Sequence, residues 1–480
     1  MNKLFGYVCA FAVCLLTAGA SSAATLTVNS GGDLQAALNA AQPGDTILLQ
    51  YGATFTGNFY LPLKTGTSTS YITIRSSAAD TKLPAAGVRM TPSFAVYLPK
   101  IRGAGSMQAF RAKASTHHWK FQFLEIIGNA QGINEVVQMG TGSETTTAQL
   151  PHHITFDRVY IHGDSAKGAR RALTLNTGSV TVRDSYINEI KQIGIETQCL
   201  GGWNGTGPYL IENNYLSGAG VNIMFGGATP KIPNLVPSDI TIRRNLLTKD
   251  TRWRGTTFTV KGHFEVKNGQ RIVVEGNRFE YTWEQDQKGY SITLMPWNNG
   301  AAPWTVVQDV TIRNNRFDHI ASGITIVGTH RVSGVVVSKT SSRIAILNNL
   351  LTDVTVDHNT VIHDGAVLNG NGASNVRFVF TNNLMKHNVD GIYGDGLGPG
   401  MVSLNKYFVG GEFRRNVLAG GVASKYPPDN FFPPTSEFLG NFVSATGGDY
   451  HLGTWSPYNA AGTDGQDVGA DVDKITAASR

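Results

Sequence analysis

The stretch Ile240-Thr-Ile-Arg-Arg-Asn245 decides the fold, because its pattern returns along most of the chain. In most copies two hydrophobic residues flank one outward residue, two mainly polar residues follow, and asparagine comes last. Weaker copies lie at 154–159 and 180–185. Asn349 is a rival for the Asn359 copy, and we prefer Asn359 because its strand pattern is complete. The full copies end 24 to 44 residues apart, at Asn214, Asn245, Asn277, Asn315, Asn359, Asn383 and Asn416.

Alternation within each copy predicts a strand that buries one face. It puts Ile240 and Ile242 on the inner face, and Thr241 and Arg243 on the outer face. Asparagine tolerates left-handed backbone geometry at the turn that follows, and stacked asparagines can bond each other's amides. Unequal spacing indicates inserted loops. Leucine-rich repeats are shorter and leucine-dominated, and propeller blades need antiparallel hairpins. The pattern therefore predicts an all-β chain with a single right-handed parallel β-helix.

The two ends of the chain indicate export and capping. Lys3, the apolar run from Leu4 to Leu16 and the small residues up to Ala24 are typical of a secretory signal peptide over 1–24. We therefore expect a secreted or periplasmic protein, with residues 25–480 as one β-helix domain. A short amphipathic helix over 33–41, with Asp33 as N-cap, would cover the open end. Residues 422–480 are expected to form a closing loop and strands, at 449–452 and 467–470.

Composition narrows the function classes. The 480 residues include 55 glycines, only 15% are charged, and the net charge is +6. Removing the signal peptide takes away Lys3 and no acid, which leaves +5. Cys199 is then the only cysteine, expected as a small buried hydrophobe. Sparse, spread charge argues against nucleic-acid binding, and no later segment reaches the ~20 apolar residues of a membrane helix. We expect a monomer.

Several stretches resemble secreted bacterial right-handed β-helix proteins with the pectin-lyase-like fold. The resemblance begins in the cap at 34–46 and runs through most of the mature chain. It implies the fold and export, whereas many members of that group have no assigned reaction. Thr229 stands before Pro230 where related sequences tend to carry an aspartate. The most specific stretches are 207–215, 224–227, 233–239 and 267–271 with 275–277.

Motifs of three better-known β-helix enzymes are absent from the sequence. The paired aspartates of polygalacturonase-like hydrolases, the Arg-x-Pro-x-x-Arg of pectate lyases and the Asp-Pro-His-Asp of mannuronan epimerases are not found. These absences argue against three named activities without excluding catalysis.

A polar column on one outward face is the main candidate site. The stretch 263–267 alternates so that His263, Glu265 and Lys267 are expected to point outward together. Earlier coils offer Asn222, Glu196 and Asn176 on equivalent strands. Neighbouring coils lie ~4.8 Å apart, so these side chains are predicted to line one groove.

This column resembles the chondroitinase-B and alginate-lyase class of polysaccharide lyases. The resemblance implies that Asn222 and Glu265 hold Ca²⁺ against a uronate carboxylate and that Lys267 removes the C5 proton. His263 would lie beside them as a further catalytic candidate. That class carries an arginine on the next coil, and here Arg271 is the nearest candidate, although it lies at a strand edge. The alternative is a solvated strand face on which Glu265 and Lys267 pair with each other.

Substrate-binding residues are expected around the same groove. Arg170 and Arg171 could grip an anionic sugar, and Trp253 could stack on a sugar ring, alongside Glu196 and Asn176. A charged surface loop and a tryptophan that covers the core are the alternatives. The tandem pairs His117-His118 and His152-His153 should place their rings on opposite strand faces, which argues against a shared metal.

These features predict a secreted carbohydrate-active β-helix protein that cleaves or binds an acidic, uronate-containing polysaccharide. If it is catalytic, β-elimination by a lyase is expected first and glycoside hydrolysis second. The alternative is a non-catalytic protein that binds glycan or serves as a structural surface element. The expected partner is a polysaccharide, with Ca²⁺ as cofactor, no nucleic acid and no membrane span.

Overall fold

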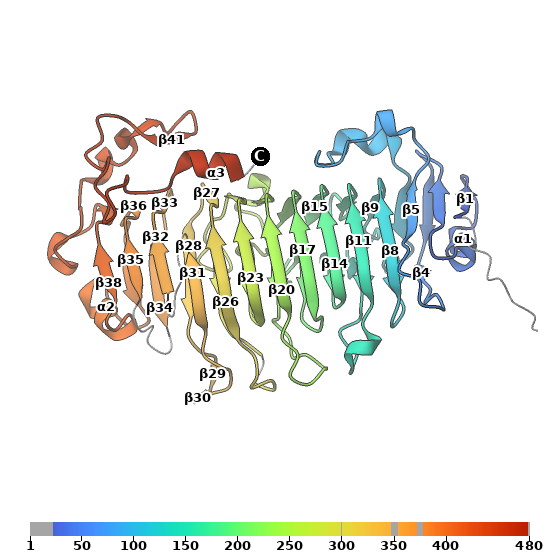
Figure 1. Cartoon of the computed structure of the whole chain (residues 1–480), viewed down its shortest axis with the longest axis horizontal. Coiled ribbons are helices and arrows are strands. Elements are labelled where there is room, and N and C mark those ends of the chain that lie inside the picture. The colour runs from blue at the N-terminus through green and yellow to red at the C-terminus, as the bar shows by residue number, and fades with distance from the viewer. Residues whose placement is uncertain (1–22, 299, 347–353, 372–377, 479–480) are drawn as a thin grey trace, which may run out of the picture.

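The computed structural model describes residues 23–298, 300–346, 354–371 and 378–478. Over these residues the chain winds into a right-handed parallel β-helix, as the repeat predicts (Figure 1). Most coils contribute one strand to each of three long parallel sheets, which we call sheets 1, 2 and 3. The repeat of the sequence forms sheet 1, which faces the viewer in Figure 1.

The strand bounds follow the sheets. Sheet 1 contains β1 (Thr25–Val28), β2 (Thr46–Leu49), β5 (Ile72–Ser76), β8 (His117–Gln122), β11 (His152–Asp157), β14 (Gly178–Arg183), β17 (Gly207–Glu212), β20 (Ser238–Arg243), β23 (Gly269–Glu275), β26 (Val307–Arg313), β31 (Ser342–Ile346), β32 (Val354–Asp357), β35 (Val379–Thr381) and β38 (Glu412–Arg414). Sheet 2 contains β3 (Thr54–Gly57), β6 (Lys100–Gly103), β9 (Glu125–Ile127), β12 (Tyr160–His162), β15 (Tyr186–Ile190), β18 (Tyr215–Gly218), β21 (Leu246–Thr248), β24 (Arg278–Glu280) and β27 (Arg316–Asp318). Sheet 3 contains β4 (Phe59–Leu61), β7 (Phe110–Ala112), β10 (Glu135–Met139), β13 (Arg171–Leu175), β16 (Gln198–Gly202), β19 (Val221–Phe225), β22 (Phe264–Val266), β25 (Tyr290–Leu294), β28 (Ser322–Val327), β34 (Leu368–Asn371) and β37 (Ile392–Gly394).

The remaining elements are short. A three-stranded sheet holds β33 (Thr360–Val361), β36 (Leu384–Lys386) and β39 (Val417–Ala419), and two hairpins hold β29 (Arg331–Val332) with β30 (Val335–Val336) and β40 (Phe442–Ser444) with β41 (Asp449–Leu452). The helices are α1 (Leu34–Ala40), α2 (Met401–Tyr407) and α3 (Val472–Ala478). The 3-10 turns are η1 (Asp80–Lys82), η2 (Pro92–Tyr97), η3 (Thr147–Gln149), η4 (Thr251–Trp253), η5 (Ala423–Lys425), η6 (Thr435–Glu437) and η7 (Leu439–Asn441).

An asparagine ladder runs along the turn after sheet 1. The Nδ2 of Asn245 donates to Oδ1 of Asn277 at 2.9 Å. Equivalent contacts join the asparagines in two runs, from Asn214 to Asn315 and from Asn359 to Asn416. Asn430, which the repeat does not include, extends the ladder beyond Asn416. The left-handed residue is the one before each asparagine, as at Arg244 with φ 56°, so our expectation of a left-handed asparagine is wrong. Asn359 belongs to this ladder, and Asn349 lies outside the described residues.

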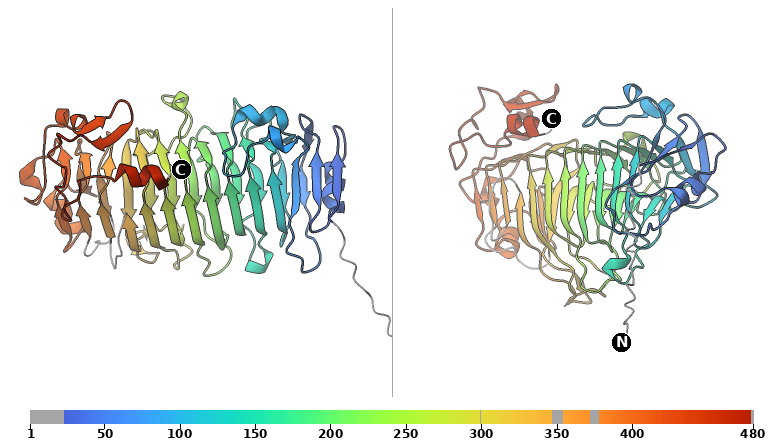
Figure 2. Two further views of the ribbon diagram at one scale, coloured as in Figure 1. Left: turned by 45° about the horizontal axis from the view of Figure 1, so that its top comes forward. Right: turned by 45° about the vertical axis from the view of Figure 1, so that its right-hand side comes forward.

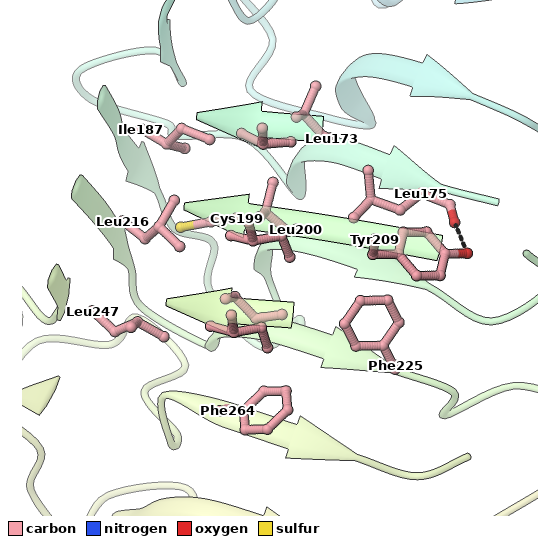
Figure 3. Close-up of a cluster of buried hydrophobic side chains, with 14 of the residues drawn as sticks. Leu173, Leu175, Ile187, Cys199, Leu200, Tyr209, Leu216, Phe225, Leu247 and Phe264 are labelled. Atoms are coloured by element: carbon pink, nitrogen blue, oxygen red, sulfur yellow. Dashed lines mark hydrogen bonds between the residues drawn. The ribbon is translucent and has the colours of Figure 1, made fainter. Parts of the chain in front are cut away.

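The interior is a column of stacked aliphatic and aromatic side chains. Figure 3 shows Leu173 of β13, Leu200 of β16 and Phe264 of β22, all in sheet 3, near leucines of sheet 2. Cys199 is fully buried among them, as predicted, and burial raises the pKa of its thiol to about 12. The Tyr209 hydroxyl lies in the same core and donates to the carbonyls of Leu175 and Thr177.

The ends of the solenoid are covered by non-repeating segments. Helix α1 buries Leu34 and Leu38 against the first coil, and the Asp33 side chain accepts from Ala36 N at 2.9 Å. At the other end β40 and β41 form an antiparallel hairpin. The predicted strand at 467–470 is absent, and α3 follows instead. Figures 1 and 2 show α3 and the segment 77–99 along the same edge of the solenoid. Across the described residues, no helix is both long and apolar enough to cross a membrane.

Candidate functional site

An open groove of about 750 Å³ crosses the outer face of sheet 1. It spans β14, β17, β20, β23 and β26, which lie side by side in sheet 1 in Figure 1. We describe its lining as a floor and two walls. The lining residues are Ser179, Val180, Thr181, Pro208, Tyr209, Leu210, Asp239, Thr241, Arg243, Arg271, Ile272, Val273, Asp309 and Thr311.

The groove floor alternates between hydroxyl and aliphatic side chains. In register along the axis stand Thr181, Leu210, Thr241, Val273 and Thr311. Adjacent strands are ~4.8 Å apart, so the threonine hydroxyls recur about every 10 Å. The floor therefore offers hydrogen-bonding and apolar positions with a period of two coils.

The longer wall belongs to a charge ladder with the same two-coil period, and Arg243 is the ladder residue that lines the groove. The residues in register are Arg183, Glu212, Arg243, Glu275 and Arg313. Arg183 forms its ion pair with Asp157 on the preceding strand. Arg243 Nε lies 2.8 Å from Glu212, and Arg313 Nη2 lies 3.0 Å from Glu275. Opposite charges on neighbouring strands stabilise the sheet modestly. The guanidinium groups therefore recur on every second coil.

The second wall carries a shorter ladder at the beginning of the strands. Arg271 donates to both Asp239 oxygens, at 2.7 and 2.9 Å, and Arg343 donates to Asp309 at 2.7 Å. All four residues have φ between 51° and 59°, which breaks strand alternation and turns their side chains outward. Hydrogen bonding from Arg271 lowers the pKa of Asp239, and that from Arg343 lowers the pKa of Asp309.

Along the first ladder the guanidinium groups are more exposed to solvent than their acidic partners, whereas on the second wall Asp239 is 54% and Asp309 34% exposed. The side chains of Arg183, Arg243, Arg271, Arg313 and Arg343 are 42–51% exposed. Their acidic partners on the first wall are more buried: 0% for Asp157, 13% for Glu212 and 29% for Glu275. The exposed N–H groups of a guanidinium suit planar anions such as carboxylates.

The predicted Glu265–Lys267 column lies on a different face, on sheet 3. Both side chains point outward as predicted, while Phe264 and Val266 are buried in the core. The Lys267 ammonium lies 3.0 Å from Glu265, whose side chain is 1% exposed. The Gly226-Gly227 turn packs against Lys267. The two side chains pair with each other, as in the alternative that we considered, but the pair is buried and the strand face is not solvated as that alternative supposed.

Asn222 and His263 point into the interior, so their predicted place in an outward groove is wrong. Both residues lie where the chain passes from sheet 2 to sheet 3. Side chains alternate between the inner and outer faces of the strand only after this corner. Asn222 donates to the carbonyls of Leu216 and Thr248 and accepts from Lys249 at 3.0 Å. His263 is fully buried, with ring nitrogens 2.8 Å from Ser291 Oγ and from the Glu280 carbonyl. Asn222 and Glu265 therefore do not fit the expected Ca²⁺ site.

Lys249, which no sequence pattern indicated, fills this corner. It is fully buried, and its Nζ lies 2.7–2.8 Å from the carbonyl oxygens of Gly218, Gly220 and Gly262. Burial lowers its pKa to about 7. Its role in the described structure is internal, because it satisfies backbone acceptors that the corner leaves open.

Arg271 and Lys267 are separated by the fold. Lys267 follows β22 in sheet 3, whereas Arg271 lies in β23 on sheet 1. The lysine and arginine expected to share a lyase site therefore face different sides of the solenoid. Only Arg271 of the three predicted catalytic residues lies in the groove.

The predicted substrate-binding residues are mostly structural. Arg171 bonds to Glu135 at 2.9 Å and packs over Trp203. Asn176 is buried and accepts from the backbone N–H groups of Trp203 and Asn204 at 2.9 Å. Trp253 is buried against Val260 and Trp283, so it is not available for stacking on a ring.

Two other predicted binding residues lie nearer the surface. Arg170 is exposed, and Glu196 pairs with Lys261 at 2.5 Å. Neither lines the groove of sheet 1. The groove on sheet 1 was not recognised as a site from the sequence. The sequence does carry a signal for it, since the fourth position of the repeat alternates between arginine and glutamate from Arg183 to Arg313.

Comparisons with known proteins bear on the fold. Residues 171–361 match the family model described as a right-handed β-helix region. None of the curated proteins matches the chain significantly. Several solved structures are similar at low identity, among them the following three. A mannuronic acid specific polysaccharide family 6 lyase from human gut microbiota has 12% identity and a TM-score of 0.45, covering 86% of this chain and 92% of its own. Pectate lyase Pel9A has 14% identity and a TM-score of 0.38, covering 94% and 96%. The surface adhesin PfbA of Streptococcus pneumoniae has 12% identity and a TM-score of 0.38, covering 75% and 86%.

Proposed function

We propose that this protein binds an acidic polysaccharide along the outer face of sheet 1, outside the cytoplasm. The observation that carries the proposal is the two-coil period shared by the groove floor and its longer wall. Thr241 and Arg243 stand together on one coil, and the same pair of residue types recurs two coils away on either side. A regular polymer presents equivalent groups at a regular interval, so a periodic surface matches it.

The groups in the groove favour a sugar polymer that carries carboxylates. Threonine hydroxyls can bond to ring hydroxyls, while Leu210 and Val273 offer apolar contact to the C–H faces of the rings. The half-exposed guanidinium groups retain N–H donors for a carboxylate beyond their ion pairs. A spacing of about 10 Å, two coils, is of the order of two linked pyranose rings.

The first experiment measures binding of the purified protein to soluble polyuronates and to neutral polysaccharides of similar length. Polyuronates are expected to bind more tightly, and their binding should weaken as salt is added. Arg271→Gln and Arg243→Gln should each weaken binding about tenfold, since one charge-assisted hydrogen bond is worth ~1.5 kcal/mol or more. Equal affinity for neutral and acidic polymers would refute the acidic class.

Arg415→Gln provides the matched control. Arg415 is 43% exposed and pairs with Asp429 at 3.2 Å, yet it lies beyond β38 and outside the groove. Its substitution should leave polysaccharide affinity unchanged. If Arg415→Gln and Arg271→Gln weaken binding equally, the attraction reflects overall charge and the groove is not the site.

Cleavage is tested in the same incubations. A lyase that removes the C5 proton creates an unsaturated uronate with new ultraviolet absorbance, and a hydrolase creates reducing ends without it. Product that disappears in Lys267→Ala would establish the lyase hypothesis on sheet 3. Product that persists in this variant would place the chemistry elsewhere.

A further inference from the structure

Four histidines gather on the outer face of sheet 1, at the beginning of β8 and β11. They form two consecutive pairs, His117-His118 and His152-His153, on neighbouring strands. Strand alternation would put the rings of each pair on opposite faces. Instead His118 has φ 56° and His153 has φ 54°, which breaks the alternation and brings the rings together. The sequence predicts that the two rings of each pair lie on opposite strand faces, which argues against a shared metal. That prediction is wrong, because the two rings lie on the same face.

The rings form a compact two-by-two arrangement. His117 stacks on His152 with centroids 5.0 Å apart, and His118 stacks on His153 at 4.6 Å, both with an interplanar angle of 13°. Within each pair the two Nδ1 atoms are 2.8 Å and 2.7 Å apart. One ring nitrogen from each of His118, His152 and His153 lies within 4.8 Å of the others.

The close approach of the rings makes them candidates for metal ligands. A metal ion bonds to a ring nitrogen of a neutral imidazole. Three such nitrogens, from two neighbouring strands, already lie within 4.8 Å of one another. The geometry therefore suits a set of imidazole ligands.

We infer that His118, His152 and His153, with His117 beside them, form a binding site for a late first-row transition metal ion such as Zn²⁺. Zinc–imidazole bonds are about 2.0–2.1 Å, which places tetrahedral ligand nitrogens about 3.4 Å apart. The three nitrogens must therefore approach by about an ångström. Rotation of the His153 ring, which is exposed, and of the half-buried His152 ring provides this movement.

The donor set selects the class of metal. Imidazole nitrogen suits Zn²⁺, Ni²⁺ and Cu²⁺, whereas Ca²⁺ prefers oxygen ligands. On the next coil Gly178, which has no side chain, stands in register with His152. The fourth position of the ion is then filled by His117 or by water. This inference does not depend on the proposed polysaccharide binding.

The test is titration of the full folded chain with Zn²⁺ alone in a calorimeter, with equilibrium dialysis to count bound metal. One Zn²⁺ per chain is expected, and Ca²⁺ in excess should not compete. His118→Ala and His153→Gln should each weaken binding at least tenfold. His451→Ala is the matched control, because His451 is half-exposed beside Asp449 and Asp473 in another part of the chain.

Two further measurements keep the result decisive. Zn²⁺ should raise the thermal unfolding midpoint of the wild type and of His451→Ala, but not that of His153→Gln. Because residue 153 is exposed, the His153→Gln variant is expected to fold normally. Cu²⁺ bound at the site should show hyperfine coupling to several nitrogens in its electron paramagnetic resonance spectrum. Zn²⁺ binding that survives in both cluster variants, or no binding at all, would overturn the inference.

Discussion

The buried ammonium of Lys249 makes a sharp prediction about stability and pH. Its pKa is about 7 in the folded protein, because burial penalises the charged form, against 10.5 for an ordinary lysine. Between these values the unfolded chain binds a proton that the folded chain does not. The contribution of Lys249 to the free energy of unfolding therefore increases with pH between about 7 and 10.5, and it is smallest below about pH 7.

The magnitude follows from the two pKa values. From about pH 7 to about pH 9, linkage gives a gain of about 2 kcal/mol in the free energy of unfolding. This window avoids the Cys199 thiol, whose raised pKa of about 12 acts in the opposite direction above about pH 9. Lys249→Met should also destabilise the protein by about 3 kcal/mol near pH 9, since it leaves several buried acceptors unpaired.

The assay is urea unfolding followed by tryptophan fluorescence at several pH values. Comparing wild type with Lys249→Met cancels the titrating groups that do not interact with Lys249. The deficit of the variant should grow by about 2 kcal/mol from about pH 7 to about pH 9. Lys288→Met is the control, because Lys288 is 59% exposed, and its curve should run parallel to the wild type. A constant difference between wild type and Lys249→Met would show that the buried lysine stays charged and would refute the reasoning.

Three further predictions concern the solenoid itself. Asn245→Ala should lower the free energy of unfolding by about 3 kcal/mol, because Asn245 makes four ladder hydrogen bonds, whereas exposed Asn39→Ala should change it little in the same urea assay. Burial alone would raise the pKa of Asp157, but hydrogen bonds from two arginines hold it well below 3.8, so wild-type stability should fall as pH drops below about 4. Asp157→Asn should be less stable near neutrality and show a shallower fall in acid titrations; an identical acid slope would contradict this. Gly218→Ala would place a Cβ 2.8 Å from Cys199 Sγ, so it should lower the thermal midpoint, and adding Cys199→Ala should recover part of the loss.

The fold could be predicted from sequence because one physical pattern repeats. Each coil must bury two side chains on one strand face, and each must turn at a fixed place, so Ile240, Ile242 and Asn245 have counterparts in most coils. The position of a residue along the solenoid follows from this register. Phe264 and Val266 accordingly lie in the core, whereas Glu265 and Lys267 lie off the core face but are buried and line no open groove.

The candidate site could not be predicted in the same way, because corners and left-handed residues break alternation. His263 lies at a corner and turns inward, while Arg271 has a positive φ and joins the opposite sheet from Lys267. Neither feature has a marker in the local sequence. An assignment that counts alternate residues therefore fails at the positions where functional side chains were sought.

The sequence by itself determined the solenoid, the order of its coils and the asparagine ladder, because these depend on contacts between identical positions one coil apart. Only the tertiary structure decided which outward residues share a surface. The two-coil period of Thr241 and Arg243 becomes a groove only when sheet 1 is built, and His118 meets His153 only because the backbone departs from alternation at both. Local hydrophobic burial determines the solenoid and the order of its coils. The backbone conformation of single residues determines which outward side chains share a surface.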